Sequence, residues 1–386
     1  MDRRTLRNLD FLFVLFTALL LIASLIILST ASINVIPSDP MHYVKSQAVW
    51  IVIGIGIAVA LAAADYEKWR AYRWWIYGLN LLLLLAVIFF GDAAKGATRW
   101  IPTPFGFNIQ PSEFAKLFII LTLADFLADR KGKLNNYSDF IMPFLFVLVP
   151  MLLIFKQPDL GTTLVFMAIF IGMMFVAGAN PWKFGGLLLG GTAIMGVALW
   201  FHFSTSLPWW LHWAQGMPLP MQDYQLARLT IFMNPAADMS GNGYHIIQSI
   251  WAIGSGGLWG KGYQMGTQGQ LNFLPEHHTD FIFSVVGEEF GFVGTITLLF
   301  LFLIFILRSL SIAFKARDTY GMLISTGIIS MFTFHILINV GMTSGIMPVT
   351  GIPLPFISAG GSAMFANMAA VGLLLSVNLR RRRLMF

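Results

Sequence analysis

The stretch LNFLPEHHTDFIFSVVGEEFGFVG, residues 271–294, changes from polar to apolar at its centre. Its polar half ends at Asp280, and a long apolar run follows that is interrupted only by Glu288 and Glu289. A helix of roughly 26 residues is ~39 Å long, which is enough to cross a bilayer with some tilt. Asp280 is therefore predicted to lie where a transmembrane helix leaves the hydrocarbon.

Two roles fit a carboxylate at this boundary. A partly buried Asp280 could act as the base of an enzyme that works at the membrane surface, because burial and neighbouring charges tune a carboxyl pKa. It could equally cap the helix, because aspartate accepts hydrogen bonds from free N–H groups and complements the helix dipole. The spacing alone does not choose between these roles.

The composition excludes an ordinary soluble domain. Of the 386 residues, 57% are hydrophobic and only 11% are charged, whereas soluble domains carry about 25% charged residues. The mean hydropathy is +0.74. Cysteine is absent from the sequence, which excludes disulfides and cysteine-ligated metals. The predicted fold class is an all-α polytopic membrane protein.

Ten apolar runs are each predicted to form a transmembrane helix, within one domain that covers residues 1–386. They lie at about 11–28, 47–64, 74–90, 112–128, 140–155, 160–177, 184–203, 281–307, 320–343 and 359–379. The first run is too long for a signal-peptide core and lacks an A-x-A cleavage site, so we interpret it as a retained span. An even number of spans places both termini on one side.

Lysine and arginine gather on the side of the N-terminus. Of the 24 such residues, 17 fall there, at 3–7, 68–73, 130–133, 183, 308–317 and 380–383. The positive-inside rule assigns that side to the cytoplasm. Both termini are therefore predicted to be cytoplasmic. The net charge of +6 is interpreted as a topology signal and not as a nucleic-acid patch.

The opposite, extracytoplasmic side carries a large loop between the seventh and eighth spans, at about 204–279. Loops longer than about 15 residues are usually functional or disordered, and this one is not of low complexity. Trp209, Trp210 and Trp213 suit a membrane interface. We expect short interfacial or re-entrant helices in this loop.

Four polar clusters lie at the outer ends of the predicted spans. The first contains Arg99 and, further on, Glu113 and Lys116, which are three residues apart on one helix face and can form an ion pair. Ser112 is the predicted N-cap of that helix. The second cluster contains Asp159, which is predicted to cap the sixth span. A purely structural role is the alternative for both clusters.

The third cluster surrounds Asp280. Glu288 lies about 12 Å deeper along the helix, too far to share a proton with Asp280. Glu288 and Glu289 are therefore expected to pair inside the bundle. His277 and His278 suggest a metal site, but adjacent helical residues do not converge and no third ligand is evident.

The fourth cluster is PLPFISAGGS at 353–362, which contains Ser358, Gly360 and Gly361. Glycines at a helix start leave backbone N–H groups free to face an anion, so the turn could cradle a diphosphate. Close helix packing by small residues is the alternative. Because all four clusters lie at one boundary, a substrate with a polar head and an apolar tail would fit.

At these positions the chain resembles the SEDS family (shape, elongation, division and sporulation), whose members include RodA and FtsW. The compact termini favour the RodA branch. The residues that carry the resemblance are KGATRW at 95–100, QPSEFAKL at 110–117, QPDLGT at 157–162, LPEHHTDFIFSVVGEEFG at 274–291 and PLPFISAGGS at 353–362. The one departure is Ala359, which stands where many members have an aromatic residue.

The resemblance implies a peptidoglycan glycosyltransferase that polymerises lipid II, an undecaprenyl-diphosphate-linked disaccharide peptide. The reaction would take place at the outer face of the bacterial cytoplasmic membrane and serve cell elongation and shape. A class B penicillin-binding protein is the implied partner. The family's essential aspartate corresponds to Asp280. The predicted substrate-binding residues are Arg99, Glu113, Lys116, Asp159, Ser358, Gly360 and Gly361.

In this family the donor sugar is α-linked and the polymer β-linked. Inversion needs one base to activate the acceptor hydroxyl and no covalent enzyme intermediate, and Asp280 is the predicted base. The leaving diphosphate needs positive charge from Arg99, Lys116, the glycine-rich turn or a divalent cation, Mg or Mn. No other cofactor is expected. The alternatives are a lipid II flippase or transporter, and a non-catalytic scaffold of the cell-wall machinery.

Overall fold

The structure is a computed structural model, and it describes residues 8–36, 38–94, 97–102, 108–204, 223–235, 238, 241–270 and 273–381. The three tryptophans expected at a membrane interface, Trp209, Trp210 and Trp213, lie outside the described residues.

Each of the ten predicted spans corresponds to one long helix. These helices are α2 (Phe11–Ala31), α3 (His42–Ala63), α5 (Arg73–Phe90), α6 (Pro111–Ala128), α7 (Tyr137–Lys156), α8 (Leu160–Val176), α9 (Pro181–Phe203), α13 (Ile282–Phe314), α14 (Thr319–Thr343) and α15 (Gly361–Leu379). Within the described chain, eight are long and apolar enough to span a membrane by themselves. The other two are α8, which has 17 residues, and α6, which carries charged side chains. The predicted all-α polytopic membrane fold is confirmed.

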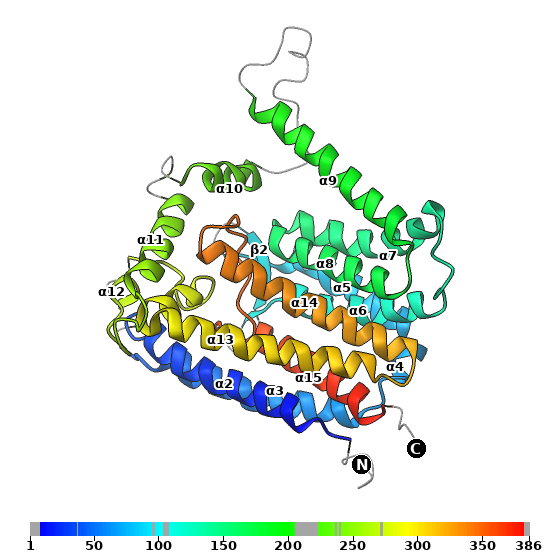
Figure 1. Cartoon of the computed structure of the whole chain (residues 1–386), viewed down its shortest axis with the longest axis horizontal. Coiled ribbons are helices and arrows are strands. Elements are labelled where there is room, and N and C mark those ends of the chain that lie inside the picture. The colour runs from blue at the N-terminus through cyan, green and yellow to red at the C-terminus, as the bar shows by residue number, and fades with distance from the viewer. Residues whose placement is uncertain are drawn as a thin grey trace.

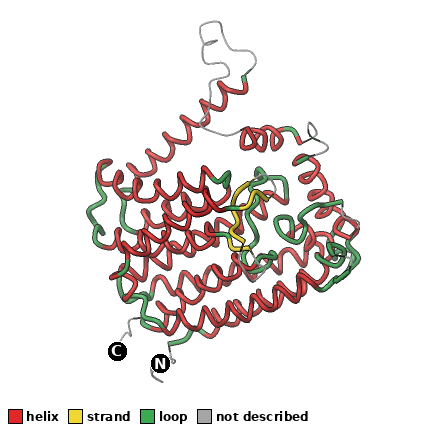
Figure 2. Tube along the Cα trace, turned by 180° about the vertical axis from the view of Figure 1, so that it is seen from behind, coloured by secondary structure: helices red, strands yellow, loops and turns green. Residues whose placement is uncertain are grey.

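Short elements fill the connections. They are the helices α4 (Lys68–Ala71), α10 (Asp223–Met233), α11 (Asn242–Ser255) and α12 (Thr267–Gln270), and the strands β1 (Asp92–Ala94), β2 (Ala97–Pro102) and β3 (Asn108–Ile109). The described part of the long 204–279 loop thus contains short helices, as predicted. The strands form an antiparallel sheet in the order β1-β2-β3, which is drawn in yellow among the helices and loops in Figure 2.

The ten long helices differ greatly in how much of them the bundle buries. In the most apolar 18-residue stretch of α15, 83% of the residues are buried inside the bundle, and in that of α14 the share is 67%. In α9 it is only 6%, and this helix leaves the bundle at an angle (Figure 1). Helices α14 and α15 therefore form the centre against which a site can be fixed in place.

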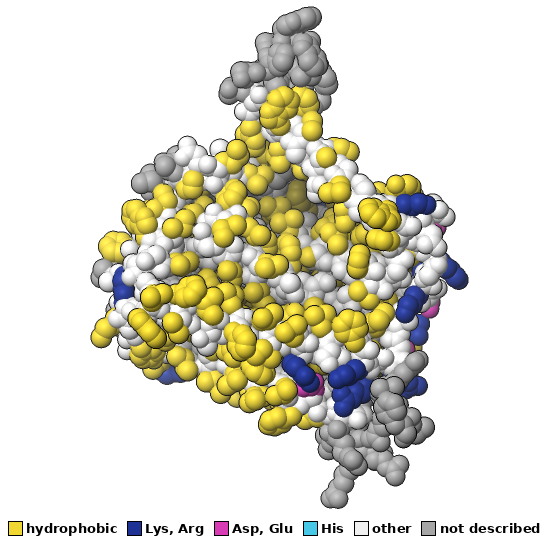
Figure 3. All heavy atoms as spheres, in the orientation of Figure 1, with side chains coloured by type: hydrophobic (Ala, Val, Ile, Leu, Met, Phe, Trp, Pro, Cys, Tyr) yellow, Lys and Arg dark blue, Asp and Glu magenta, His cyan; other side chains and the backbone are white. Residues whose placement is uncertain are grey.

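Both ends of the described chain meet at one end of the bundle, which we call the terminal end. The side-chain amide of Asn8 donates to the carbonyl of Leu379 at 3.1 Å, and that of Asn378 donates to the carbonyl of Asn8 at 3.0 Å. In Figure 3 the basic side chains gather toward this end, whereas hydrophobic side chains cover the flank of the bundle. The predicted placement of the two termini on one side agrees with this arrangement.

Helix α13 is broken at Gly291, where the sequence predicted one continuous span. Gly291 has φ of 61°, and a Cβ atom there would lie 2.3 Å from the amide nitrogen of Gly260. Only glycine can adopt this positive φ without strain and has no Cβ atom to clash with the backbone of Gly260. The break lets the loop after α11 bond to the helix, since the N–H of Phe292 donates to the carbonyl of Gly257 at 2.9 Å.

Glu288 and Glu289 hold the same loop, so the prediction that they pair internally is confirmed. Glu288 lies 2.6 Å from Lys261 Nζ and accepts the backbone N–H of Thr267 at 2.7 Å. Glu289 accepts the N–H of Gln264 at 3.2 Å. Both carboxylates are buried, and burial of a charge requires such partners.

Candidate functional site

A small polar cavity lies between α6, α8, α14 and the loop that precedes α15. Its volume is about 40 Å³, which is close to the volume of a single water molecule and too small for a sugar. Four predicted substrate-binding residues line it together. The lining residues are Arg99, Gln110, Glu113, Lys116, Asp159, Thr162, Val165, His335, Gly351, Ile352 and Pro353.

Lys116 and Glu113 form the predicted ion pair on α6. Lys116 Nζ lies 2.9 Å from Glu113 Oε1, and both side chains are buried. On its other side Nζ is 3.2 Å from His335 Nε2. An ammonium group only donates hydrogen bonds, so Nε2 must accept and the imidazole must be neutral. The lysine is thus held between a carboxylate of its own helix and a ring from α14.

The predicted N-cap at Ser112 is wrong. Helix α6 begins at Pro111, and Gln110 occupies the N-cap position. Proline has no N–H to satisfy and its fixed φ suits the first helical position, so it sets the start two residues earlier than Ser112 would. The Ser112 hydroxyl instead accepts from the side chain of Gln110 at 3.1 Å.

Asp159 caps α8, as predicted. Its carboxylate accepts the backbone N–H of Thr162 at 3.1 Å and the Thr162 hydroxyl at 2.9 Å. Arg99, from β2, lies 3.9 Å from the same carboxylate and donates to the carbonyls of Gln157 and Pro158. The cavity therefore contains two cationic and two anionic side chains, whose formal charges cancel.

Asp280 does not occupy the N-cap position of α13, where the capping alternative placed it. The helix begins at Ile282, and its N-cap position belongs to Phe281. The Asp280 carboxylate lies instead against the wall of the cavity. A Cβ atom added to Gly351, which lines the cavity, would be 3.3 Å from Asp280 Oδ2.

The other three predicted residues are not among those that line the cavity. The Ser358 hydroxyl donates to the carbonyl of Thr279 at 2.7 Å and accepts the N–H of Leu354 at 2.8 Å. The N–H of Gly360 points to Gln47 Oε1 at 3.4 Å. A Cβ atom on Gly361 would lie 3.0 Å from the ring of Trp50. These contacts match the packing alternative given for the glycine-rich turn.

His277 and His278 each have contacts that explain them. His277 Nδ1 lies 2.6 Å from the carbonyl of Leu274, and burial lowers the pKa of the His277 imidazole. The His278 ring packs on Tyr43 with centroids 4.6 Å apart. Among the residues that the structure describes, no three His, Cys, Asp or Glu side chains are grouped to hold a metal ion.

Two polar residues of α14 were not predicted from the sequence as site residues, namely His335, which lines the cavity, and Asn339, one turn further on. Both are buried. The signal was available, because polar side chains inside a predicted membrane span are costly and usually functional. Their spacing of four residues also places them on one helix face.

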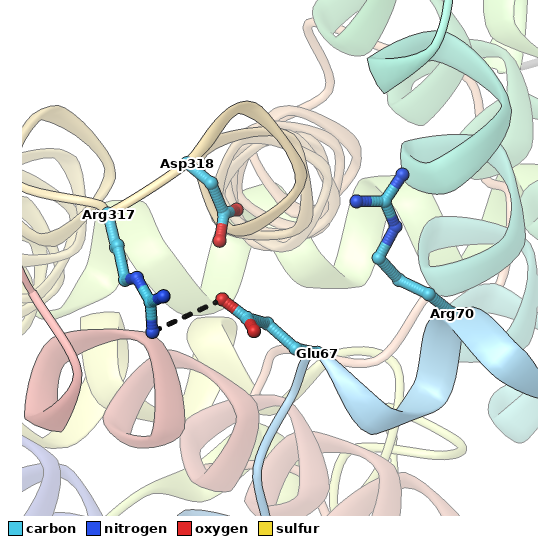
Figure 4. Close-up of a pocket in the computed structure, with 4 residues that line it drawn as sticks. All are labelled: Glu67, Arg70, Arg317 and Asp318. Carbon is cyan, nitrogen blue, oxygen red and sulfur yellow. Dashed lines mark ion pairs between the residues drawn. The ribbon is translucent and has the colours of Figure 1, made fainter.

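A larger polar cavity, of about 580 Å³, lies toward the terminal end and is lined by Glu67, Arg70, Arg317 and Asp318 (Figure 4). None of the predicted site residues lines it. Arg317 lies 3.5 Å from Glu67, and Asp318 caps α14 through the N–H of Gly321. These contacts connect helix ends to one another. Because predicted site residues line the smaller cavity and not this one, the smaller cavity is the candidate site.

Comparison with known proteins gives consistent matches. The FtsW/RodA/SpoVE family, described as a cell cycle protein, matches residues 9–383. The "Peptidoglycan glycosyltransferase RodA" of Treponema pallidum is 37% identical, over 88% of this chain and 90% of its own length.

Two solved structures have similar folds. One, titled "Structural coordination of polymerization and crosslinking by a peptidoglycan synthase complex", superposes with a TM-score of 0.76 at 30% identity, over 96% of this chain and 97% of the other. The rod shape determining protein RodA of Thermus thermophilus gives 0.69 at 28% identity, over 97% and 98%.

The buried pair predicts a non-additive effect on stability. Lys116→Met leaves the Glu113 carboxylate buried without its counter-ion, which costs about 3 kcal/mol or more. Replacing both charges, in Glu113→Leu with Lys116→Met, removes the unpaired charge and should recover much of that loss. Thermal unfolding in one detergent should therefore give a lower midpoint for the single variant than for the double variant. Additive losses would contradict the pairing.

Proposed function

This chain belongs to the FtsW/RodA/SpoVE (SEDS) family, and from that premise we propose that it polymerises lipid II with Asp280 as the general base. The enzyme class is that of its relatives named peptidoglycan glycosyltransferase. The observation that supports the site most strongly is the placement of the Asp280 carboxylate against Gly351, on the wall of a cavity that carries Arg99 and Lys116.

In the proposed reaction Asp280 takes the proton of the acceptor 4-hydroxyl. The acceptor oxygen then bonds to the anomeric carbon of the donor sugar, while the bond from that carbon to the diphosphate oxygen breaks. The bonding electrons leave with the diphosphate, so one displacement inverts the anomeric centre and no enzyme-bound sugar forms. Asp280 precedes the N-cap residue Phe281, and its carboxylate lies next to Gly351, where it is proposed to serve this role.

Arg99 and Lys116 are the cations proposed to stabilise the leaving diphosphate. Each is paired with a carboxylate, Asp159 and Glu113, at 3.9 and 2.9 Å. Since these four charges cancel, a diphosphate entering alone would bring uncompensated negative charge into the bundle. A divalent cation, Mg or Mn, carried in by the diphosphate would supply the missing positive charge, and we include it in the proposal on that ground.

The proposed setting is the outer face of the bacterial cytoplasmic membrane, within one transmembrane domain whose large extracytoplasmic loop spans about 204–279. A partner of the class B penicillin-binding proteins is proposed, because a similar solved structure belongs to a peptidoglycan synthase complex. The likeness to a rod shape determining protein supports a role in cell elongation.

Polymerisation in detergent tests the proposed activity. The purified chain, with a class B penicillin-binding protein present, should convert labelled lipid II into glycan strands that a muramidase digests. Detergent leaves no two compartments, so transport cannot produce this signal. If the chain makes no polymer there but moves lipid II across liposomes, the flippase alternative is correct and the proposal is wrong.

Orientation has a separate test, because the natural chain contains no cysteine. Lys45 and Lys133 are both exposed lysines, at the start of α3 and in the loop after α6 respectively. A membrane-impermeant thiol reagent on intact spheroplasts should label Lys45→Cys and spare Lys133→Cys. The opposite labelling pattern would place the candidate site on the cytoplasmic side.

A further inference from the structure

Three successive backbone carbonyl groups of the turn that carries Asp280 accept hydrogen bonds from elsewhere in the bundle. All three donors come from the loop before α15 or from α14. The carbonyl of His278 accepts the N–H of Ala359 at 3.1 Å, that of Thr279 accepts the hydroxyl of Ser358 at 2.7 Å, and that of Asp280 accepts the amide of Asn339 at 2.9 Å. A turn held at each residue in this way has little freedom to move relative to α14.

Asn339 joins the Asp280 turn to the cavity wall. Its side-chain nitrogen donates to the carbonyl of Asp280 and also, at 2.8 Å, to the carbonyl of Ile352, which lines the cavity. A primary amide has two N–H donors on one atom, so it can bridge two carbonyl oxygens where a hydroxyl can serve only one. The side chain is fully buried, which shields both hydrogen bonds from water.

His335 makes the matching connection one turn earlier on α14. One ring nitrogen is 3.2 Å from Lys116 Nζ, and the ring also hydrogen-bonds the backbone of Pro353. Proline has no N–H, so its carbonyl is the acceptor. Two side chains on one face of α14 therefore hold the consecutive carbonyls of Ile352 and Pro353. Asn339 also donates to the carbonyl of Asp280, and His335 also contacts Lys116.

We propose that Asn339 is a positioning residue that fixes the Asp280 carboxylate relative to the Lys116 cavity, with Ser358 as its second support. This inference rests on the proposed function. It also assigns Ser358 a role in holding the base, in place of the substrate contact that the sequence predicted. A misplacement of a catalytic group by about 1 Å can lower the rate about 10²-fold without changing substrate affinity.

Asn339→Leu removes both donors and keeps a side chain of similar size. We expect kcat for lipid II polymerisation to fall at least about 10-fold, with KM changed less than about 3-fold, because only the geometry of the base is altered.

The matched control is Asn378→Leu. Asn378 is equally buried and also donates to a backbone carbonyl, that of Asn8, but at the terminal end. Its loss should lower the unfolding midpoint and leave kcat within about 3-fold. Equal kcat values in the two variants would overturn the inference, as would a raised KM with unchanged kcat in Asn339→Leu.

Ser358→Ala is a milder second variant, in case Asn339→Leu fails to fold. If Ser358 supports the Asp280 turn, kcat should fall several-fold and KM should stay constant. A substrate-binding hydroxyl would instead raise KM, and that result would contradict the inference. Wild-type protein is measured in parallel. If wild type itself makes no polymer, the proposed function fails, whereas active wild type with unaffected variants refutes only the positioning role.

Discussion

The buried ammonium of Lys116 constrains the whole site. A charge inside a membrane bundle is stable only when partners surround it. One partner, Glu113, comes from the same helix, and the other, His335, comes from α14. Helices α6 and α14 must therefore contact each other at Lys116 and His335, and the loop before α15 closes the space between them. The cavity, its charge balance and the position of its walls all follow from that requirement.

The cationic side chains of the cavity and the proposed base come from different elements. Arg99 and Lys116 line the cavity, whereas Asp280 lies next to Gly351 on its wall and is bonded to α14 through Asn339. Such a division suits a displacement that needs positive charge at the leaving group and a base at the attacking hydroxyl. Because α14 is one of the most buried helices, it can keep the two parts at a fixed separation.

Features that depend on neighbours in sequence were predictable. The ten helices followed from apolar runs, the Glu113 and Lys116 pair from their spacing of three residues, and the cap at Asp159 from its place before α8. Local reasoning failed at Ser112, where Pro111 sets the helix start, and at the capping alternative for Asp280, because Phe281 holds the N-cap position of α13. The break at Gly291 was not predictable, because it depends on a loop more than 30 residues earlier in the chain packing against α13.

The connections around Asp280 join residues far apart in sequence. Ser358 lies 79 residues from Thr279, and Asn339 lies 59 residues from Asp280. No periodicity or motif encodes such a pairing, so the sequence could suggest that these residues matter but not what each one holds. The contacts of the glycine-rich turn at 353–362 were likewise not predictable from the sequence. Its residues were expected at a diphosphate, and they contact Gln47 and Trp50.

The proposed mechanism depends most on Asp280 being the base, and the polymerisation rate of Asp280→Asn tests that role directly. Asparagine keeps the shape and the backbone hydrogen bonds of the turn but cannot take up a proton. In detergent, with lipid II and a partner penicillin-binding protein, the variant should remain folded and bind lipid II as wild type does, yet polymerise at least about 10²-fold more slowly. A rate close to that of wild type would contradict the account.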